Sequence, residues 1–121
     1  MYLLGNSAIA YLAFYKERYP NIEPGEILPG SISPELNLDL LRGELGFNGL
    51  IVSDATPMGG LTSVGPREDI VPMVIQNGCD IFLFSVDDDN DFALLLQAAR
   101  AGTITPTRLE EAVLRVLAFK A

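Results

Sequence analysis

Short apolar runs and helix-forming stretches alternate along the whole chain, and this alternation limits the fold more than any other feature of the sequence. Residues 50–53 and 81–84 are apolar runs of strand length, and residues 2–4 are a third candidate. Such alternation is typical of α/β folds whose strands run parallel. The chain is therefore predicted to be α/β, with buried parallel strands joined by helices.

Capping residues indicate where the helices begin and end. A hydroxyl residue followed by proline is a typical helix start, because the hydroxyl accepts a backbone N–H and proline needs none at the first position. Glycine directly after an apolar stripe is a typical end. The predicted helices run from Ser33-Pro34 to Gly46, over residues 68–77 with Pro72 in the first turn, from the acidic run to Gly102, and onward from Thr105-Pro106.

Charge and residue usage exclude several classes of function. Sixteen acidic and eight basic residues give a net charge of −8, which repels nucleic-acid phosphates and anionic lipids. There is no histidine, so serine-type triads and most zinc sites cannot be built from these residues. Proton chemistry would have to use carboxylates. The single cysteine, Cys79, precedes an apolar run and is expected to be a buried thiol.

No targeting or membrane segment is predicted. Residues 1–15 are apolar but lack the basic residues that open a signal peptide. No apolar run approaches the roughly 20 residues that span a bilayer. We therefore expect a globular, cytoplasmic protein with neither membrane nor nucleic acid as a partner.

Asp54 is the main candidate for chemistry, because it ends the apolar run at 50–53. Ligands of parallel α/β folds bind at the carboxyl ends of the strands, so a carboxylate placed there faces the site. Position alone leaves a second interpretation open, in which Asp54 only caps the following turn through backbone N–H groups.

A receiver domain is one alternative, with Asp54 as phosphoacceptor and Met58 shortly after it. The chain length fits. However, phosphoryl transfer of that kind needs an acidic pair for Mg²⁺ and a lysine at another strand end. The only lysines are Lys16 and Lys120, which fall in helical or terminal surroundings, so the sequence argues against this alternative.

A longer pattern resembles family 3 glycoside hydrolases. It consists of Leu-Pro-Gly-Ser at 28–31, Leu-Leu-Arg at 40–42, Glu-Leu-Gly-Phe-Asn-Gly at 44–49 and the strand that ends in Ser53-Asp54. Residues 77–84 are similar to the last barrel strand of that family, and residues 101–117 to the helix that closes its barrel domain. The resemblance covers about residues 28–121. It implies that Asp54 is the nucleophile of a retaining glycosidase.

Within the family the chain looks most like the bacterial β-N-acetylhexosaminidase branch, because Met58 falls where that branch commonly has a methionine that lines the sugar site. Met58 could equally fill a gap in the core. The resemblance implies a β-linked N-acetylglucosaminide or glucoside as substrate and no cofactor. It also places the acid/base group and the residues that grip the sugar on earlier strands, outside this chain.

The length indicates a part of a barrel. A complete (β/α)₈ barrel takes about 250 residues, so residues 1–121 are expected to be the C-terminal part of the barrel domain, with its last strands and helices only. Such a part would need the missing barrel half or a homo-oligomer to cover its open surfaces. A non-catalytic module that binds sugar or assists assembly is the alternative from another functional class.

Two further groups of residues have simpler interpretations. The acidic run at 87–91 resembles a calcium loop, but Phe92 and Ala98 occupy positions where an EF-hand needs glycine and glutamate. We expect a solvated helix start there and no metal site. Asn6 stands where the family commonly has a histidine, so no role is transferred to it.

Overall fold

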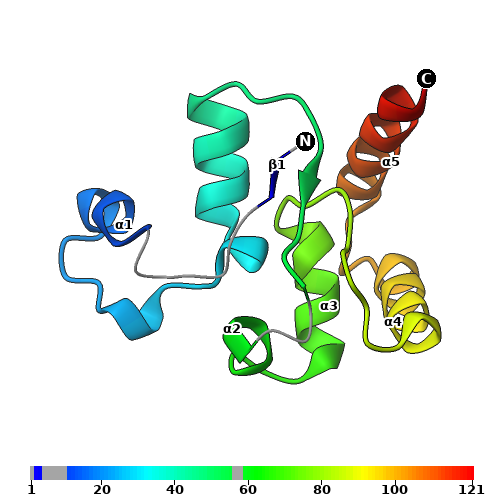
Figure 1. The fold of residues 1–121 in the computed structure, drawn as a ribbon, viewed down its shortest axis with the longest axis horizontal. Helices are drawn as coiled ribbons and strands as arrows, with labels where there is room; N and C mark the ends of the chain where they lie inside the picture. The colour runs from blue at the N-terminus through cyan, green and yellow to red at the C-terminus, as the bar shows by residue number, and fades with distance from the viewer. Residues whose placement is uncertain (1, 4–10, 56–58) are drawn as a thin grey trace.

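The computed structural model describes residues 2–3, 11–55 and 59–121 (Figure 1). Within them the chain is mostly helical, and its two strands are short. In chain order the elements are β1 (Tyr2–Leu3), α1 (Leu12–Arg18), η2 (Pro24–Glu26), η3 (Gly30–Ile32), η4 (Glu35–Glu44), β2 (Ile51–Val52), α2 (Gly59–Thr62), α3 (Arg67–Gln76), α4 (Asp88–Ala101) and α5 (Pro106–Lys120).

The strand contacts are parallel, as predicted. β1 pairs with β2, with Tyr2 opposite Ile51 and Leu3 opposite Val52. On its other side Val52 forms a parallel bridge to Ile81. β2 is therefore the central strand of the three segments.

The prediction of a buried strand at 81–84 is wrong beyond its first residue. Ile81 alone bridges to β2, and Phe84 is 68% exposed with a φ of 49°. The reason lies in Ser53, whose Oγ accepts the N–H of Leu83 at 2.9 Å. A side chain thus takes the place of the next backbone partner, and the regular ladder ends.

The four predicted helices are confirmed as η4, α3, α4 and α5. Side-chain caps form hydrogen bonds at the start of η4, α4 and α5, whereas Pro66 before α3 forms none. Ser33 Oγ accepts the N–H of Leu36 at 3.1 Å. Asp87 Oδ1 accepts that of Asn90 at 3.0 Å, and Thr105 Oγ1 accepts that of Arg108 at 3.3 Å. These contacts satisfy backbone donors that have no partner inside the helix.

Two details of the helices differ from the predictions. Pro72 lies in the second turn of α3 and not in the first, because α3 already begins at Arg67. Only one backbone hydrogen bond of the helix is lost there. The helix η4 has π-type geometry, which the sequence did not indicate, with Leu45 N–H donating to Leu40 O at 2.9 Å.

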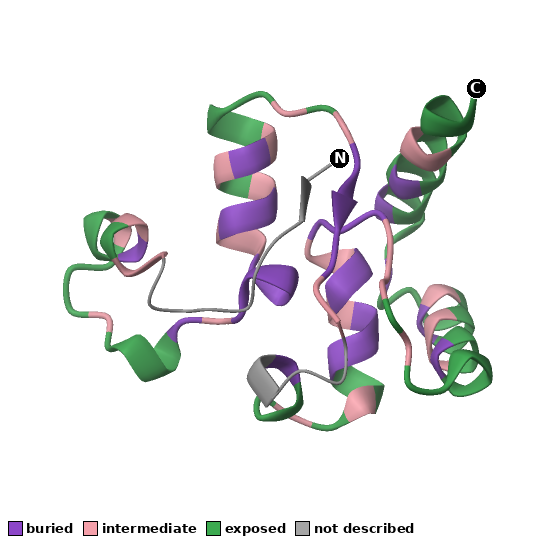
Figure 2. Cartoon of the chain, viewed as in Figure 1, coloured by how far each residue is buried: buried purple, intermediate pink, exposed green. Residues whose placement is uncertain are grey.

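The larger core lies where α3 packs against η3, α4 and α5, beneath β2 (Figure 2). Its buried members are Ile32, Leu41, Ile51, Leu61, Ile70, Val74, Ile75, Cys79, Ala98 and Ile104. A smaller cluster joins α1 to the start of η4 through Tyr15, Ile27 and Leu36. Among the described helices, none is both long and apolar enough to cross a membrane.

Candidate active site

Asp54 follows β2 at its carboxyl end, as the sequence predicts. Ile51 and Val52 are buried, and their β-branched side chains suit the core between the helices. Ser53 continues the strand direction, because its N–H donates to Ile81 O at 3.0 Å. The chain then leaves the sheet, and Asp54 becomes half-buried. This residue therefore stands at the end of the central parallel segment.

Two buried serines fix the backbone around Asp54. Ser31, in η3, accepts the Asp54 N–H on its Oγ at 2.8 Å. Ser53 holds Leu83 of the neighbouring segment through its own Oγ. Both serine side chains lie fully inside the protein, where a hydroxyl hydrogen bond is costly to lose. The position of Asp54 is thus tied to η3 on one side and to the segment after Ile81 on the other.

The Asp54 carboxylate also takes part in its own turn. Its Oδ1 accepts the N–H of Ala55 at 2.8 Å. This is the capping contact that the second interpretation of Asp54 predicts. Among the described residues, the other carboxylate oxygen accepts no hydrogen bond. Local capping and a chemical role are compatible, because a backbone donor holds a carboxylate in one orientation and stabilises its charge.

Met58, the predicted sugar-lining residue, lies outside the described residues, and so does Asn6. Residues 56–58 begin two positions after Asp54. The described part of the site therefore consists of Asp54 with the two serines that hold it.

A second polar cluster lies at the opposite, amino end of β2 and was missed by sequence reasoning. The Asp80 side chain is fully buried and forms ion pairs with Arg42 at 2.5 Å, Arg108 at 2.5 Å and Arg115 at 3.4 Å. Asp80 also forms two hydrogen bonds with Ile51, the first residue of β2. Its Oδ2 accepts the Ile51 N–H at 3.0 Å, and its own N–H donates to Ile51 O at 2.7 Å.

The arginines tie this cluster to the rest of the fold. Arg42 donates to the carbonyls of Phe47 and Gly49 at 2.9 and 2.6 Å. Arg108 donates to those of Ile75 and Cys79 at 3.0 and 3.2 Å. One carboxylate thereby connects η4, the entry to β2, the end of α3 and helix α5. Residues at the amino face of parallel barrel strands serve stability more than chemistry, and the Asp80 cluster fits that role.

Burial shifts the pKa values of groups near the cluster. Desolvation lowers the pKa of Arg42, although neighbouring Asp80 opposes the shift. Burial, with the Asp80 charge as a second cause, raises the pKa of the Cys79 thiol to about 12. Cys79 is therefore a buried neutral thiol, as predicted, and is not suited to act as a nucleophile.

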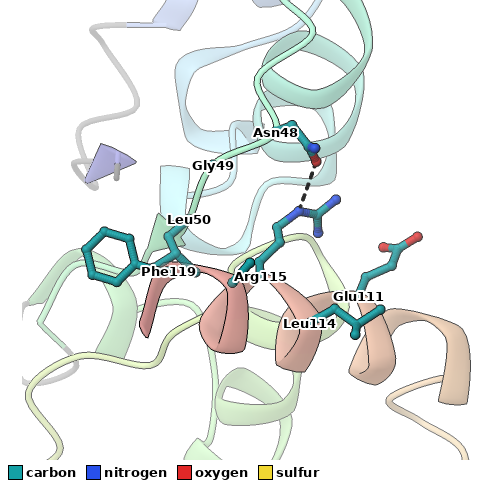
Figure 3. A pocket seen from close by; sticks show the side chains of 8 residues that line it. Asn48, Gly49, Leu50, Glu111, Leu114, Arg115 and Phe119 are labelled. Atoms are coloured by element: carbon teal, nitrogen blue, oxygen red, sulfur yellow. Dashed lines mark hydrogen bonds between the residues drawn. The ribbon is translucent and has the colours of Figure 1, made fainter. Parts of the chain in front are cut away.

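A pocket of about 430 Å³ lies beside this cluster (Figure 3). Asn48 and Leu50, at the entry to β2, form one wall, and Leu114, Arg115 and Phe119 of α5 form the other. Arg115 Nε donates to Asn48 Oδ1 across it at 3.4 Å. The pocket is at the amino end of β2, whereas Asp54 is at the carboxyl end, so it does not belong to the candidate active site.

The acidic run forms the start of α4, as predicted, but it is not simply solvated. Asp91 is 2% exposed and pairs with Arg67 of α3 and with the hydroxyl of Ser85. In the described ranges, no three His, Cys, Asp or Glu residues are grouped so that they could hold a metal ion.

Comparisons with known proteins agree with the family resemblance of the sequence. The sequence model described as "Glycosyl hydrolase family 3 N terminal domain" matches residues 15–119. A Beta-N-acetylglucosaminidase/beta-glucosidase of Cellulomonas fimi is 52% identical over 109 residues, covering 90% of this chain and 19% of the relative. A Beta-hexosaminidase of Pseudomonas aeruginosa is 32% identical over 92 residues, covering 76% and 27%. The chain thus spans only about a fifth to a quarter of the length of these relatives.

Solved structures show the same relationship. A beta-glucoside phosphorylase, BglX, has a TM-score of 0.76 and 44% identity, covering 84% of this chain and 18% of its own. A family 3 beta-N-acetylglucosaminidase from Paenibacillus sp. str. FPU-7 has a TM-score of 0.71 and 31% identity, covering 84% and 20%. The family match over most of the chain, together with these relatives, shows that the chain belongs to glycosyl hydrolase family 3, within its N-terminal domain.

Proposed function

We propose that this chain supplies the nucleophile, Asp54, of a retaining glycoside hydrolase that acts on β-linked N-acetylglucosaminides or glucosides. We propose further that residues 1–121 are the last strands and helices of a (β/α)₈ barrel. The observation that carries the proposal is the place of Asp54, directly after the central parallel strand of a family 3 chain.

The chemistry requires two groups on opposite sides of the scissile bond. An Asp54 oxygen attacks the anomeric carbon while the bond to the leaving oxygen breaks, and an acid protonates that oxygen. The resulting glycosyl ester is then attacked by water, whose proton passes to the same acid/base group, and the carboxylate is regenerated. This chain contributes the carboxylate, and the acid/base group belongs to other parts of the protein.

The surroundings of Asp54 suit the nucleophile. Asp54 is half-buried, so part of the residue is open to solvent, and the Ala55 N–H fixes one carboxylate oxygen. Ser31 holds the backbone from a second element. Attack needs an ionised, oriented oxygen close to the anomeric carbon, and rigid support of this kind keeps the oxygen in place.

Names of the relatives support the substrate class. The Cellulomonas fimi relative is named for both N-acetylglucosaminide and glucoside substrates, and the Pseudomonas aeruginosa relative is a Beta-hexosaminidase. We propose that Met58 contacts the sugar in the same site.

Phosphorolysis is a second candidate function, which the similarity to a beta-glucoside phosphorylase favours. The first step would be the same. In the second step a phosphate oxygen would attack the anomeric carbon, releasing Asp54 and forming a sugar 1-phosphate instead of the free sugar. The two functions differ only in the acceptor, so product analysis in the presence of phosphate separates them.

A segment exchange tests the role of Asp54. The matching 109 residues of the Cellulomonas fimi relative are replaced by those of this chain, so that the remainder supplies the other groups. We expect turnover of an aryl N-acetyl-β-glucosaminide, and Asp54→Asn should lower it by at least about a thousandfold.

Asp39→Asn, an exposed change on η4, is the matched control and should leave turnover unchanged. Retained turnover in the Asp54→Asn chimera would contradict the proposal and favour the non-catalytic alternative, in which the chain only binds sugar or assists assembly. Running both chimeras with and without phosphate distinguishes free sugar from sugar 1-phosphate.

A further inference from the structure

The side chain of Ser31 joins the backbone at Asp54 to another element of the fold. Its Oγ accepts the Asp54 N–H at 2.8 Å, and Ser31 is fully buried. The Asp54 carboxylate is oriented by the next N–H along the chain, because Ala55 N–H donates to Oδ1 at 2.8 Å. The two contacts fix the backbone on either side of the Asp54 Cα. A shift of that backbone would therefore move the carboxylate as well.

The short helix η3 holds Ser31 in place. Each of its three carbonyls accepts a hydrogen bond from the side chain of another element: Asn37 Nδ2 donates to Gly30 O at 3.2 Å, Cys79 Sγ to Ser31 O at 3.4 Å and Asn77 Nδ2 to Ile32 O at 2.8 Å. The donors belong to η4 and to the turn that follows α3. A movement of η3 would break contacts with both elements, so the Ser31 hydroxyl is presented to Asp54 from a rigid support.

The position of the Asp54 oxygen matters most in the glycosyl transfer step. In that step an Asp54 oxygen forms a bond to the anomeric carbon while the bond to the leaving oxygen breaks, and the acid/base group protonates that oxygen. A misplacement of about 1 Å can slow such a step a hundredfold. Ser31 is buried and acts through Asp54. We propose that Ser31 is a positioning residue for the nucleophile, an inference that rests on the proposed function of Asp54.

Ser33 provides the comparison that separates positioning from structural support. It is fully buried like Ser31, and its Oγ accepts a backbone N–H, that of Leu36, at 3.1 Å. Its partners lie on α1 and η4 and do not include Asp54. Removal of either hydroxyl leaves a backbone donor without its partner, so both serine-to-alanine changes should lower the urea midpoint of unfolding. Only the change at Ser31 should also affect catalysis.

The chimera with the Cellulomonas fimi relative gives the kinetic test. Ser31→Ala should lower kcat/KM for an aryl N-acetyl-β-glucosaminide by about tenfold to a hundredfold per folded molecule. The inhibition constant of N-acetylglucosamine should stay within about twofold of wild type, because the loss concerns the transition state and not ground-state binding. Ser33→Ala should leave both constants unchanged. Rates are expressed per folded molecule from the unfolding curve of each variant.

Hydrogen exchange at the Asp54 amide is a second measurement, and it needs no turnover. Ser31→Ala should speed exchange at this amide about tenfold, because the acceptor is gone, and Ser33→Ala should leave it unchanged. Ser31→Cys fills the same space with a weaker acceptor. It should show the same two effects at smaller size, and it decides the matter if the alanine variant does not fold.

Asp54→Asn in the same chimera separates this inference from the proposed function. Retained turnover with Asp54→Asn would overturn both. If Asp54→Asn abolishes turnover while Ser31→Ala and Ser33→Ala have equal kcat/KM, the positioning role alone is overturned. Unchanged exchange at the Asp54 amide in Ser31→Ala would overturn it too, because the hydroxyl would then not hold the backbone at Asp54.

Discussion

Two aspartates at opposite ends of β2 show how surroundings determine the role of one side chain. Asp80 is fully buried, and three guanidinium groups and a backbone N–H surround it. Asp54 is half-buried, and the hydrogen bonds at it involve backbone N–H groups and Ser31. The charge of Asp80 is used inside the fold, whereas Asp54 is only partly buried. Substitutions at the two positions should accordingly affect different properties.

Asp80→Asn should lower the free energy of unfolding by about 3–5 kcal/mol, because it leaves buried arginines without their counter-charge. The loss should appear as a lower urea midpoint with a similar slope. Asp39→Asn is the matched control on an exposed helix position and should stay within about 0.5 kcal/mol of wild type. A midpoint shared by both variants would show that the Asp80 cluster contributes little to stability.

Cys79 should make stability depend on pH in the alkaline range. Burial raises the thiol pKa from its ordinary value of 9.0 to about 12. Between these two pKa values the Cys79 thiol therefore keeps its proton in the folded state and loses it in the unfolded state. This contribution is complete below pH 9 and is lost as the pH rises towards 12.

The thiol also offers a direct measurement. At pH 8 a thiol reagent should modify Cys79 only after denaturation, and a Cys79→Ala chain should lose less stability between pH 9 and 10 than wild type. Rapid labelling of the folded chain at pH 8 would contradict the assigned burial.

At the scale of elements, two glycines have a left-handed backbone. Comparing substitutions at them separates the cost of that backbone conformation from the cost of a steric clash. Gly78 has a φ of 118°, and an added Cβ would lie 2.6 Å from Asn37 Cβ. Gly102 has a φ of 79°, with no atom near an added Cβ. Gly102→Ala should therefore cost only about 1 kcal/mol. Gly78→Ala should cost about 1–3 kcal/mol more, which thermal or urea unfolding would measure. Equal costs would show that the contact with η4 relaxes freely.

Local signals predicted the elements well where the residues that decide them are close in sequence. Ser33, Asp87 and Thr105 each cap a helix within three residues, so the sequence reveals these starts. The strand predicted from Ile81 onward ends early because Ser53 accepts the N–H of Leu83, and these two residues are thirty apart in the sequence. No pattern within 81–84 shows that competition, and the strand was predicted too long.

The same distinction applies to the two ends of β2. Asp54 could be found because it ends an apolar run directly. The partners of Asp80 lie 38, 28 and 35 residues away, at Arg42, Arg108 and Arg115. One sequence feature that could have indicated the cluster is the pair Arg108 and Arg115, seven residues apart on the last helix of an acidic chain. That spacing places both on one side of a helix, but it does not indicate which acid they meet.

At the scale of the whole molecule, the proposed nucleophile and its acid/base partner belong to different parts of the protein. The chain spans 19% of its Cellulomonas fimi relative. It contains no histidine, and among the described residues no second carboxylate is hydrogen-bonded to Asp54. A nucleophile without a proton donor cannot assist the departure of a poor leaving group. The 121 residues alone should therefore not hydrolyse an aryl N-acetyl-β-glucosaminide.

Complementation makes this last prediction specific to Asp54. The Cellulomonas fimi relative, expressed without the matching 109 residues, is mixed with the 121-residue chain. Parallel strand edges and apolar faces on both pieces would then find their partners, as in a closed barrel. Turnover should appear only in the mixture, rise with the concentration of the chain until the sites are filled, and be absent with Asp54→Asn. Turnover by the isolated chain at the level of the complete relative would show that these residues hold a whole active site, and would contradict the division of catalytic groups proposed above.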